Sequence, residues 1–401
     1  MNALTGLDKP VSIYLNHAGI ICSLGSGIAN VSENLFSSND TKSFLRQSDT
    51  YSTERKLPVG EITDPLAQVS IPEEDTRNNR VLTTAIEPLL SEIENLKLRF
   101  GSQRIGVVIG TSTSGISDGE AAVQHYHKYG QLPKNYHYRK QELSSPSRYI
   151  ANWLELKGPT YSVSSACTSG AKALASGARL LRLGVCDAVI VGGVDTLCHM
   201  TIEGFSALSV TTDSICNPFS ANRNGINIGE AAGVFIMTTE PSAVSLAGWG
   251  ESSDAYHISA PHPDGIGAES AMRKALSHAG IEASAIDYLN FHGTATEQND
   301  RIEAHAVHRV FGADIACSST KALTGHTLGA AGAIEAVFCW LALQREDGLL
   351  PCHRWDGEYD TTLPPLNQIA ATAIDGRLTS AMSNSFAFGG NNSSLIMVNQ
   401  K

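Results

Sequence analysis

The sequence has 401 residues, enough for two to three domains or for two halves that share one core. Hydrophobic residues make up 42% and charged residues only 17%, a composition typical of a compact enzyme and unlike that of disordered or fibrous proteins. The formal net charge of −11 argues against nucleic acid or an anionic membrane surface as a partner.

The cysteines and the apolar stretches indicate in which cellular compartment the protein works. Eight cysteines are too few for a disulfide scaffold, and none belongs to a Cys-x-x-Cys pair. Residues 1–10 lack a basic run followed by an apolar stretch, so they predict no signal peptide. The longest apolar tract, residues 328–343, is interrupted by Glu335 and is too short to cross a bilayer. We therefore expect a cytoplasmic protein with reduced thiols and no membrane span.

Short apolar strands alternate with helices along the chain, which predicts an α/β fold with buried sheets. The composition shifts near residues 241–250, where two halves could meet. The expected strands are residues 105–110, 160–164, 188–191 (ended by two glycines), 233–237, 286–291 and 394–398, and the expected helices are residues 170–183, 300–311 and 329–343.

The first candidate site residue is Cys167, in a sharp turn of small residues between a predicted strand and a Gly/Ala-rich helix. A thiol at a helix N-terminus faces the positive end of the helix dipole, which would lower its pKa. Taken alone, the turn fits an activated nucleophile and an inert buried cysteine equally well.

Three further motifs follow in the second half. His292 stands at a predicted strand end before a Gly-Thr-Ala-Thr run, where α/β enzymes place site groups, although a structural histidine is the commoner finding. Lys321 and His326 precede a small-residue helix that contains Glu335, and a buried lysine and glutamate are costly unless they are paired. Near the end, Phe388 and two glycines form a turn that could present backbone N–H groups.

In this order, the four motifs resemble the β-ketoacyl-acyl-carrier-protein synthases of the thiolase-like superfamily, in the elongating type with one cysteine and two histidines. The resemblance covers nearly the whole chain. It also includes residues 158–159, Asp195, 222–225, 229–232, 254–257 and 261–263.

The resemblance implies a thiolase-like fold. Two pseudo-equivalent α/β halves, residues 1–245 and 246–401, would stack in five layers, α-β-α-β-α. The small-residue helices after Cys167 and after Gly329 would form the buried central layer, which accounts for their small side chains. Members of the family are dimers, so we also expect a dimer.

The resemblance also implies a decarboxylative Claisen condensation. Cys167 would take an acyl chain from an acyl carrier protein, and an enolate formed from malonyl-carrier protein would attack that thioester. His292 and His326 would stabilise the enolate oxygen, in a division of labour that the sequence does not assign. The backbone N–H groups of Cys167 and Phe388 would hold the oxyanion of the acyl-transfer step.

The remaining site residues are implied in supporting roles. Lys321 would order the site with Glu335 as its partner, and Phe388 would also gate the acyl pocket. Thr294 and Thr296 match positions that hydrogen-bond the pantetheine arm. The chemistry needs no metal and no cofactor beyond the phosphopantetheine that carries the substrates. A basic patch for the acidic carrier protein is expected, with Arg223 and Lys128 as candidates.

The details look most like ketosynthases of bacterial aryl-polyene clusters. Residues 111–115, 216–220 and 225–230 carry this likeness, and residues 125–139 are rich in Tyr, His and basic side chains. It implies a heterodimer with a chain-length-factor subunit, and otherwise a homodimer. The alternatives are a housekeeping fatty-acid elongation synthase and, from another class, an inactive scaffold. Intact Cys167 speaks against a chain-length factor, and His326 speaks against an initiating enzyme, which has asparagine there.

Two residues of the C-terminal turn depart from the housekeeping pattern. Ala387 replaces the usual glycine between the two phenylalanines, and Asn391 replaces the usual threonine after Gly-Gly. Either change could alter the mobility of the gate, because alanine adopts positive φ only at a cost.

Overall fold

The computed structural model describes residues 11–37, 42–52 and 55–401. Residues 1–10, on which the prediction of no signal peptide rests, lie outside this part. Among the described residues, no helix is long and apolar enough to cross a bilayer. The strands are β1 (Tyr14–Cys22), β2 (Gly25–Ser26), β3 (Arg46–Ser48), β4 (Leu57–Val59), β5 (Ile105–Gly110), β6 (Thr160–Val163), β7 (Ala188–Asp195), β8 (Ala231–Thr238), β9 (Val244–Ser253), β10 (Tyr288–Asn290), β11 (Ala316–Ser318), β12 (Ser380–Ala387) and β13 (Asn391–Asn399).

The strand order repeats in the two halves of the chain. The main path is β11-β10-β12-β13-β9-β1-β8-β7-β5-β6. In the first half, the last strand, β8, lies antiparallel between β1 and β7. In the second half, the last strand, β13, lies antiparallel between β9 and β12 in the same way. Two parallel neighbours then follow, β5 and β6 or β10 and β11. Tyr14 of β1 pairs with Ser245 of β9, where the two halves join. The boundary predicted at residue 245 falls at the start of β9.

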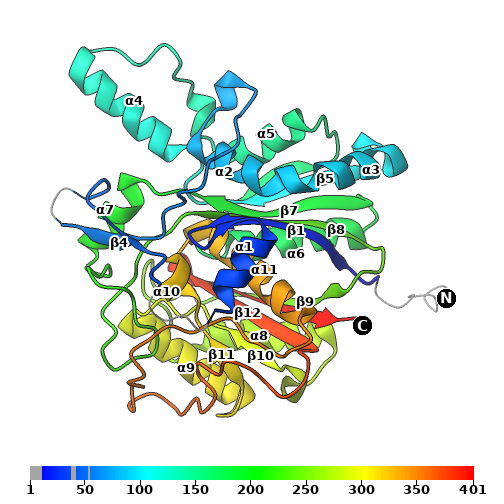
Figure 1. The fold of residues 1–401 in the computed structure, drawn as a ribbon, viewed down its shortest axis with the longest axis vertical. Helices are drawn as coiled ribbons and strands as arrows, with labels where there is room; N and C mark the ends of the chain where they lie inside the picture. The colour runs from blue at the N-terminus through cyan, green and yellow to red at the C-terminus, as the bar shows by residue number, and fades with distance from the viewer. Residues whose placement is uncertain (1–10, 38–41, 53–54) are drawn as a thin grey trace.

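Helices form three layers around these strands (Figure 1). Two of them, α6 and α11, lie between the two halves and share one hydrophobic cluster with strands of both. The outer face of the first half is covered by α2, α3 and α5, and that of the second by α8 and α9. The helices are α1 (Ile28–Leu35), α2 (Arg77–Ile86), α3 (Leu90–Phe100), α4 (Ile116–Tyr129), α5 (Ser145–Trp153), α6 (Ser169–Arg182), α7 (His199–Ala207), α8 (Ile266–Ala279), α9 (Glu297–Phe311), α10 (Lys321–Thr324) and α11 (Ala331–Gln344).

The central helices are in close contact because they carry small side chains where they cross. A Cβ atom on Gly170 of α6 would lie 2.8 Å from the backbone nitrogen of Ala333, and one on Gly332 of α11 would lie 2.8 Å from Cβ of Ala171. Both distances are shorter than van der Waals contact. The five-layer arrangement expected from the sequence is therefore present, with the small-residue helices in its middle layer.

Two element predictions are wrong in their bounds. The two glycines that follow residue 191 do not end a strand, because β7 continues through them to Asp195. They are needed for close approach, since a Cβ on Gly193 would lie 3.0 Å from the carbonyl oxygen of Gly329. The predicted helix at residues 329–343 starts later, at Ala331, after a 3₁₀ turn (Leu328–Ala330).

Candidate active site

Cys167 lies in a constrained turn between β6 and α6. Ala166 before it has a φ of 51°, a conformation that is strained for a residue with a Cβ atom. The turn is held by Ser169, whose hydroxyl accepts a hydrogen bond from Ser165 N at 2.9 Å, and by Thr168, whose hydroxyl donates to Ser165 O at 2.7 Å. The thiol is thereby fixed in the interior, and Cys167 is only 6% exposed.

His292 follows β10 and is held by a buried carboxylate. The backbone N–H groups of His292 and Gly293 each donate to Glu303 of α9 at 2.8 Å. Burial raises the pKa of Glu303 to about 7, against the opposing effect of these two hydrogen bonds. Glu303 thus fixes the peptide that presents the imidazole.

His326 comes from the loop between α10 and α11. Its backbone N–H donates to Asn227 O at 2.7 Å, and its carbonyl accepts from Gly229 N at 3.0 Å. Its Nε2 atom lies 2.9 Å from Cys167 Sγ, and its ring centroid is 5.1 Å from that of His292. One half of the chain therefore supplies the thiol and the other half both imidazoles.

Burial shifts the thiol and both imidazoles toward their uncharged forms. Burial raises the pKa of Cys167 to about 12, although the Lys321 cation and the backbone N–H groups of Cys167 and Phe388 lower it. The prediction of a thiol pKa lowered by the helix N-terminus is therefore wrong, because burial outweighs the favourable groups. Burial, together with Lys321, also holds the pKa values of His292 and His326 well below the usual 6.5.

Lys321 and Glu335 form a buried ion pair, as the sequence predicts. The Nζ to Oε1 distance is 2.6 Å, and both side chains are 2% exposed. Burial raises the pKa of Glu335 to about 7, although Lys321 opposes this. The pair places a cation close enough to lower the pKa of both imidazoles.

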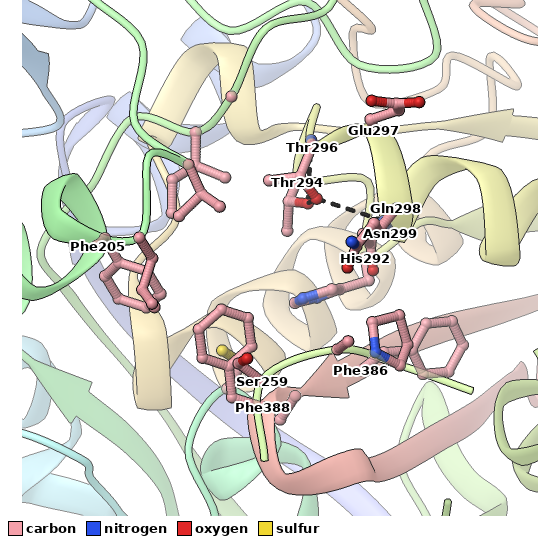
Figure 2. A pocket seen from close by; sticks show the side chains of 18 of the residues that line it. Phe205, Ser259, His292, Thr294, Thr296, Glu297, Gln298, Asn299, Phe386 and Phe388 are labelled. Atoms are coloured by element: carbon pink, nitrogen blue, oxygen red, sulfur yellow. Dashed lines mark hydrogen bonds between the residues drawn. The ribbon is translucent and has the colours of Figure 1, made fainter. Parts of the chain in front are cut away.

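A cavity of about 530 Å³ leads from the surface to these groups. Figure 2 shows His292 projecting into it, with Thr294 and Thr296 on one side and Phe205 and Phe388 on another. The hydroxyls of Thr294 and Thr296 are 3.0 Å apart. A polar pair thus lines the same cavity as the thiol.

The predicted C-terminal turn is the loop of a β-hairpin. Ala387 of β12 pairs with Asn391 of β13, and a three-residue loop (Phe388–Gly390) joins them. Gly389 and Gly390 have φ values of 79° and 70°, whereas Ala387 has a φ of −128°. Alanine at position 387 therefore carries no backbone strain in this conformation, because only the two glycines adopt left-handed φ values. Phe388 is 36% exposed, and its ring centroid lies 5.4 Å from that of Phe205.

Asp195 joins the two halves at the site, a role that the sequence analysis did not assign. Its buried carboxylate accepts hydrogen bonds from the backbone N–H groups of Ser112 at 2.8 Å, Thr113 at 2.9 Å and Gly329 at 2.6 Å. A signal was present, because Asp195 is an acid at the end of a buried strand. Of the two candidate docking cations, Arg223 is 6% exposed and paired with Asp360 at 2.6 Å. The other, Lys128, lies on α4 over the Tyr129 ring.

The thiol and the two imidazoles also have the donor types and the spacing of a metal site. Their donor atoms lie within 4.8 Å of one another and all three residues are buried. The resemblance implies chemistry without a metal, so a chelator belongs in any assay of this site.

Comparisons with known proteins agree with this geometry. The family model described as "Beta-ketoacyl synthase, N-terminal domain" matches residues 63–243, and the one described as "Beta-ketoacyl synthase, C-terminal domain" matches residues 243–352. The 3-oxoacyl-[acyl-carrier-protein] synthase 2 of Staphylococcus aureus (strain MRSA252) is 30% identical over 97% of this chain and 99% of its own. Its counterpart in Rhizobium meliloti (strain 1021) is 38% identical over 61% of each chain, less than two thirds of its length.

Solved structures give the same answer over the full length. The ketosynthase ApeO in complex with its chain length factor ApeC, from Xenorhabdus doucetiae, matches with a TM-score of 0.90 and 39% identity over 100% of both chains. The ishigamide ketosynthase/chain length factor matches with a TM-score of 0.87 and 25% identity over 98% of this chain and 100% of the other. The predicted thiolase-like α/β fold is confirmed. By fold and by sequence, the chain belongs to the β-ketoacyl synthase family.

Proposed function

We propose that this chain catalyses the decarboxylative Claisen condensation of malonyl-acyl-carrier protein with an acyl chain held on Cys167. The observation that carries the proposal is the 2.9 Å approach of His326 Nε2 to Cys167 Sγ in a cavity that His292 shares. This arrangement joins a nucleophile to a base and leaves a second imidazole for the incoming substrate.

The first step is acyl transfer. Because the resting thiol is neutral, its proton passes to the neutral His326 Nε2 as sulfur attacks the thioester carbonyl of the acyl-carrier protein. The backbone N–H groups of Cys167 and Phe388, which already face the sulfur, stabilise the oxyanion of the tetrahedral intermediate. The C–S bond to the carrier then breaks, and the carrier thiol leaves with the proton.

The second step forms the carbon–carbon bond. Malonyl-carrier protein loses CO₂, and the electron pair of the broken bond becomes an enolate. Neutral His292 can donate an N–H hydrogen bond to the enolate oxygen, and His326 can do the same as the tautomer that carries its proton on Nε2. The enolate carbon attacks the Cys167 thioester, and the bond between the acyl carbon and Cys167 sulfur breaks. The released sulfur takes up a proton from solvent, which restores the thiol, and the product is a ketoacyl-carrier protein two carbons longer. Burial, reinforced by the Lys321 cation, favours the neutral form of both imidazoles, and Glu335 balances the charge of Lys321.

The acyl chain belongs to an aryl-polyene or related type II polyketide pathway in this proposal, with fatty-acid elongation as the alternative. The full-length similarity to a ketosynthase solved with its chain length factor supports the first, and the similarity to 3-oxoacyl synthases supports the second. Both readings include an acyl carrier protein as partner and a cytoplasmic location. The ketosynthase carries Cys167, so its dimer partner would be a chain-length-factor-like subunit or a second copy.

The edge of the sheet supports a dimer. Among the described strands, β6 pairs with β5 alone and is half-exposed along its length. An open strand edge offers unpaired backbone groups to another chain. Since Cys167 follows β6 by four residues, a partner bound there would lie beside the site.

Intact-protein mass spectrometry tests the proposal. Wild type and Cys167→Ala are each given acyl-carrier proteins that bear a saturated medium chain or an aryl-polyene chain, then malonyl-carrier protein, with and without a chelator. We expect an adduct that requires Cys167, survives the chelator and yields a ketoacyl product two carbons longer. The chain that reacts identifies the pathway. No adduct, even with a co-expressed partner subunit, would contradict the proposal and favour the scaffold.

A further inference from the structure

The hairpin that carries Phe388 is anchored on both faces of β13. Asn391 and Asn392 begin this strand, and successive side chains of a strand point to opposite faces. Asn392 Nδ2 donates to Asp254 Oδ1 at 2.8 Å, in the loop that follows β9. On the other face, Asn391 Oδ1 accepts a hydrogen bond from Lys172 Nζ of α6 at 2.8 Å. The loop is therefore tied to the helix that begins just after Cys167.

Lys172 lies in an environment where it needs the hydrogen bond to Asn391. Lys172 lies five residues after Cys167 and is half-buried between α6 and β13. Burial lowers the pKa of Lys172, and the nearby Glu251 carboxylate raises it. A half-buried ammonium without an acceptor would lose solvation without compensation, so the amide oxygen of Asn391 stabilises it there.

Asn391 also lies directly under the loop. It pairs with Ala387 at the base of the hairpin, and a Cβ atom on Gly389 would lie 3.5 Å from Asn391 Nδ2. A threonine, usual here in housekeeping synthases, ends closer to the backbone than this amide. The loop bears the Phe388 ring over the cavity and the Phe388 N–H toward the thiol. Anything that fixes Asn391 therefore fixes both of these groups.

We propose that Lys172 is a positioning residue that holds the Phe388 loop closed over Cys167 through its hydrogen bond to Asn391. The inference rests on the proposed role of Phe388 as gate and oxyanion donor. Without the bond, the loop opens more often, which exposes the thiol and displaces the Phe388 N–H. Loss of the bond should therefore make Cys167 more accessible while slowing the steps that need an ordered oxyanion hole.

Alkylation of Cys167 by iodoacetamide, followed by peptide mass spectrometry, measures this accessibility without any carrier protein. We expect Lys172→Met and Asn391→Ala each to raise the alkylation rate about tenfold, as the loss of one hydrogen bond to a charged group predicts. The double variant should react no faster than either single variant, because both remove the same bond. In steady-state assays with malonyl-carrier protein, kcat should fall in both variants with little change in KM.

Matched variants distinguish loss of the Lys172–Asn391 hydrogen bond, the tether of the loop, from a general disturbance of the fold. Asn391→Asp keeps an acceptor for Lys172 and should restore the wild-type alkylation rate. Arg104→Met removes a cation that pairs with Asp187, and because neither residue is among the groups acting on Lys172, it should leave the rate unchanged. Thermal unfolding identifies any variant that fails to fold, and Asn391→Thr then replaces Asn391→Ala.

An unchanged alkylation rate in folded Lys172→Met and Asn391→Ala would overturn the proposal. Multiplicative effects in the double variant would also overturn it, since they would show that the two residues act independently. A wild type that forms no acyl-enzyme would instead contradict the proposed function, and the alkylation result would still decide whether the tether exists.

Discussion

At the scale of single residues, burial decides the protonation of the site. The residue types and their order in the chain pointed to Cys167, His292, Lys321 and His326 only through their resemblance to a known family, because each motif taken alone also fits a structural role. Their protonation could not be read from the sequence, because a thiol at a helix N-terminus has opposite pKa shifts in an exposed and in a buried position. The structure places this thiol in the buried case.

The two histidines should do separable work. His326→Asn removes the base that contacts the thiol, and we expect acyl transfer to Cys167 to slow by a factor of about 10² or more. His292→Asn leaves that contact in place and should mainly slow condensation. Rapid-quench measurement of each half-reaction distinguishes the two variants. Equal losses in both half-reactions for both variants would contradict this assignment.

The lowered pKa of His326 predicts a dependence of stability on pH. The unfolded chain binds a proton at this histidine below pH 6.5, whereas the folded chain does not, so its contribution to stability is lost as pH falls from 6.5 toward the folded-state pKa. His326→Asn should therefore unfold with a shallower loss of stability between pH 7 and 5.5, by up to about 1.4 kcal/mol per pH unit. Urea unfolding at both pH values gives this slope. Identical slopes would mean that folding does not lower the pKa of His326.

At the scale of helices and strands, prediction succeeded where side chains are distinctive. The small-residue patterns at the starts of α6 and α11 indicated close packing, and the family resemblance placed these helices in the central layer. The sequence analysis missed β1, β9 and β12, and it stopped β7 at its glycines. Those glycines permit close approach by other elements, which is a tertiary requirement that local sequence does not display.

The crossing of the central helices is open to a direct test. Gly332→Ala adds a methyl group 2.8 Å from Cβ of Ala171 and should destabilise the protein by about 1–3 kcal/mol through overpacking. Gly204→Ala is the matched control, because this exposed glycine of α7 has nothing within 4 Å of the added atom. We expect Gly204→Ala to gain about 0.5–1 kcal/mol from helix propensity. Denaturant unfolding measures both, and equal effects would mean that α6 and α11 tolerate a wider separation.

At the scale of the whole molecule, the open edge of β6 is where we expect a partner chain to pair. The backbone nitrogens of Val107 and Thr111 donate to the carbonyls of Pro159 and Val163, which face β5. Backbone groups alternate in direction along a strand, so those of Ser162 face the open edge. The sequence indicated a dimer only through family resemblance, because an open edge depends on which strands become neighbours.

Ser162→Pro tests this edge. Proline removes the outward N–H of Ser162 and keeps the bonds to β5, so we expect the assembly to dissociate toward the 42.6 kDa single chain. Ser162→Ala is the control, since it removes only the hydroxyl contact to Ser147 at 2.8 Å. Light scattering after size-exclusion chromatography, with and without the partner subunit, gives the mass. An assembly that survives the proline would place the interface elsewhere.

The strand order also has a consequence for synthesis on the ribosome. In each half, the strand made last inserts between the strand made first and the rest of the sheet. Until residues 231–238 have been synthesised, β1 lacks its long partner, and β9 then waits for residues 391–399. Both β1 and β9 are largely apolar, so while they are unpaired they would make a nascent chain prone to aggregation. The thiol from one half and the imidazoles from the other meet only after both insertions, so partly made chains carry no working site.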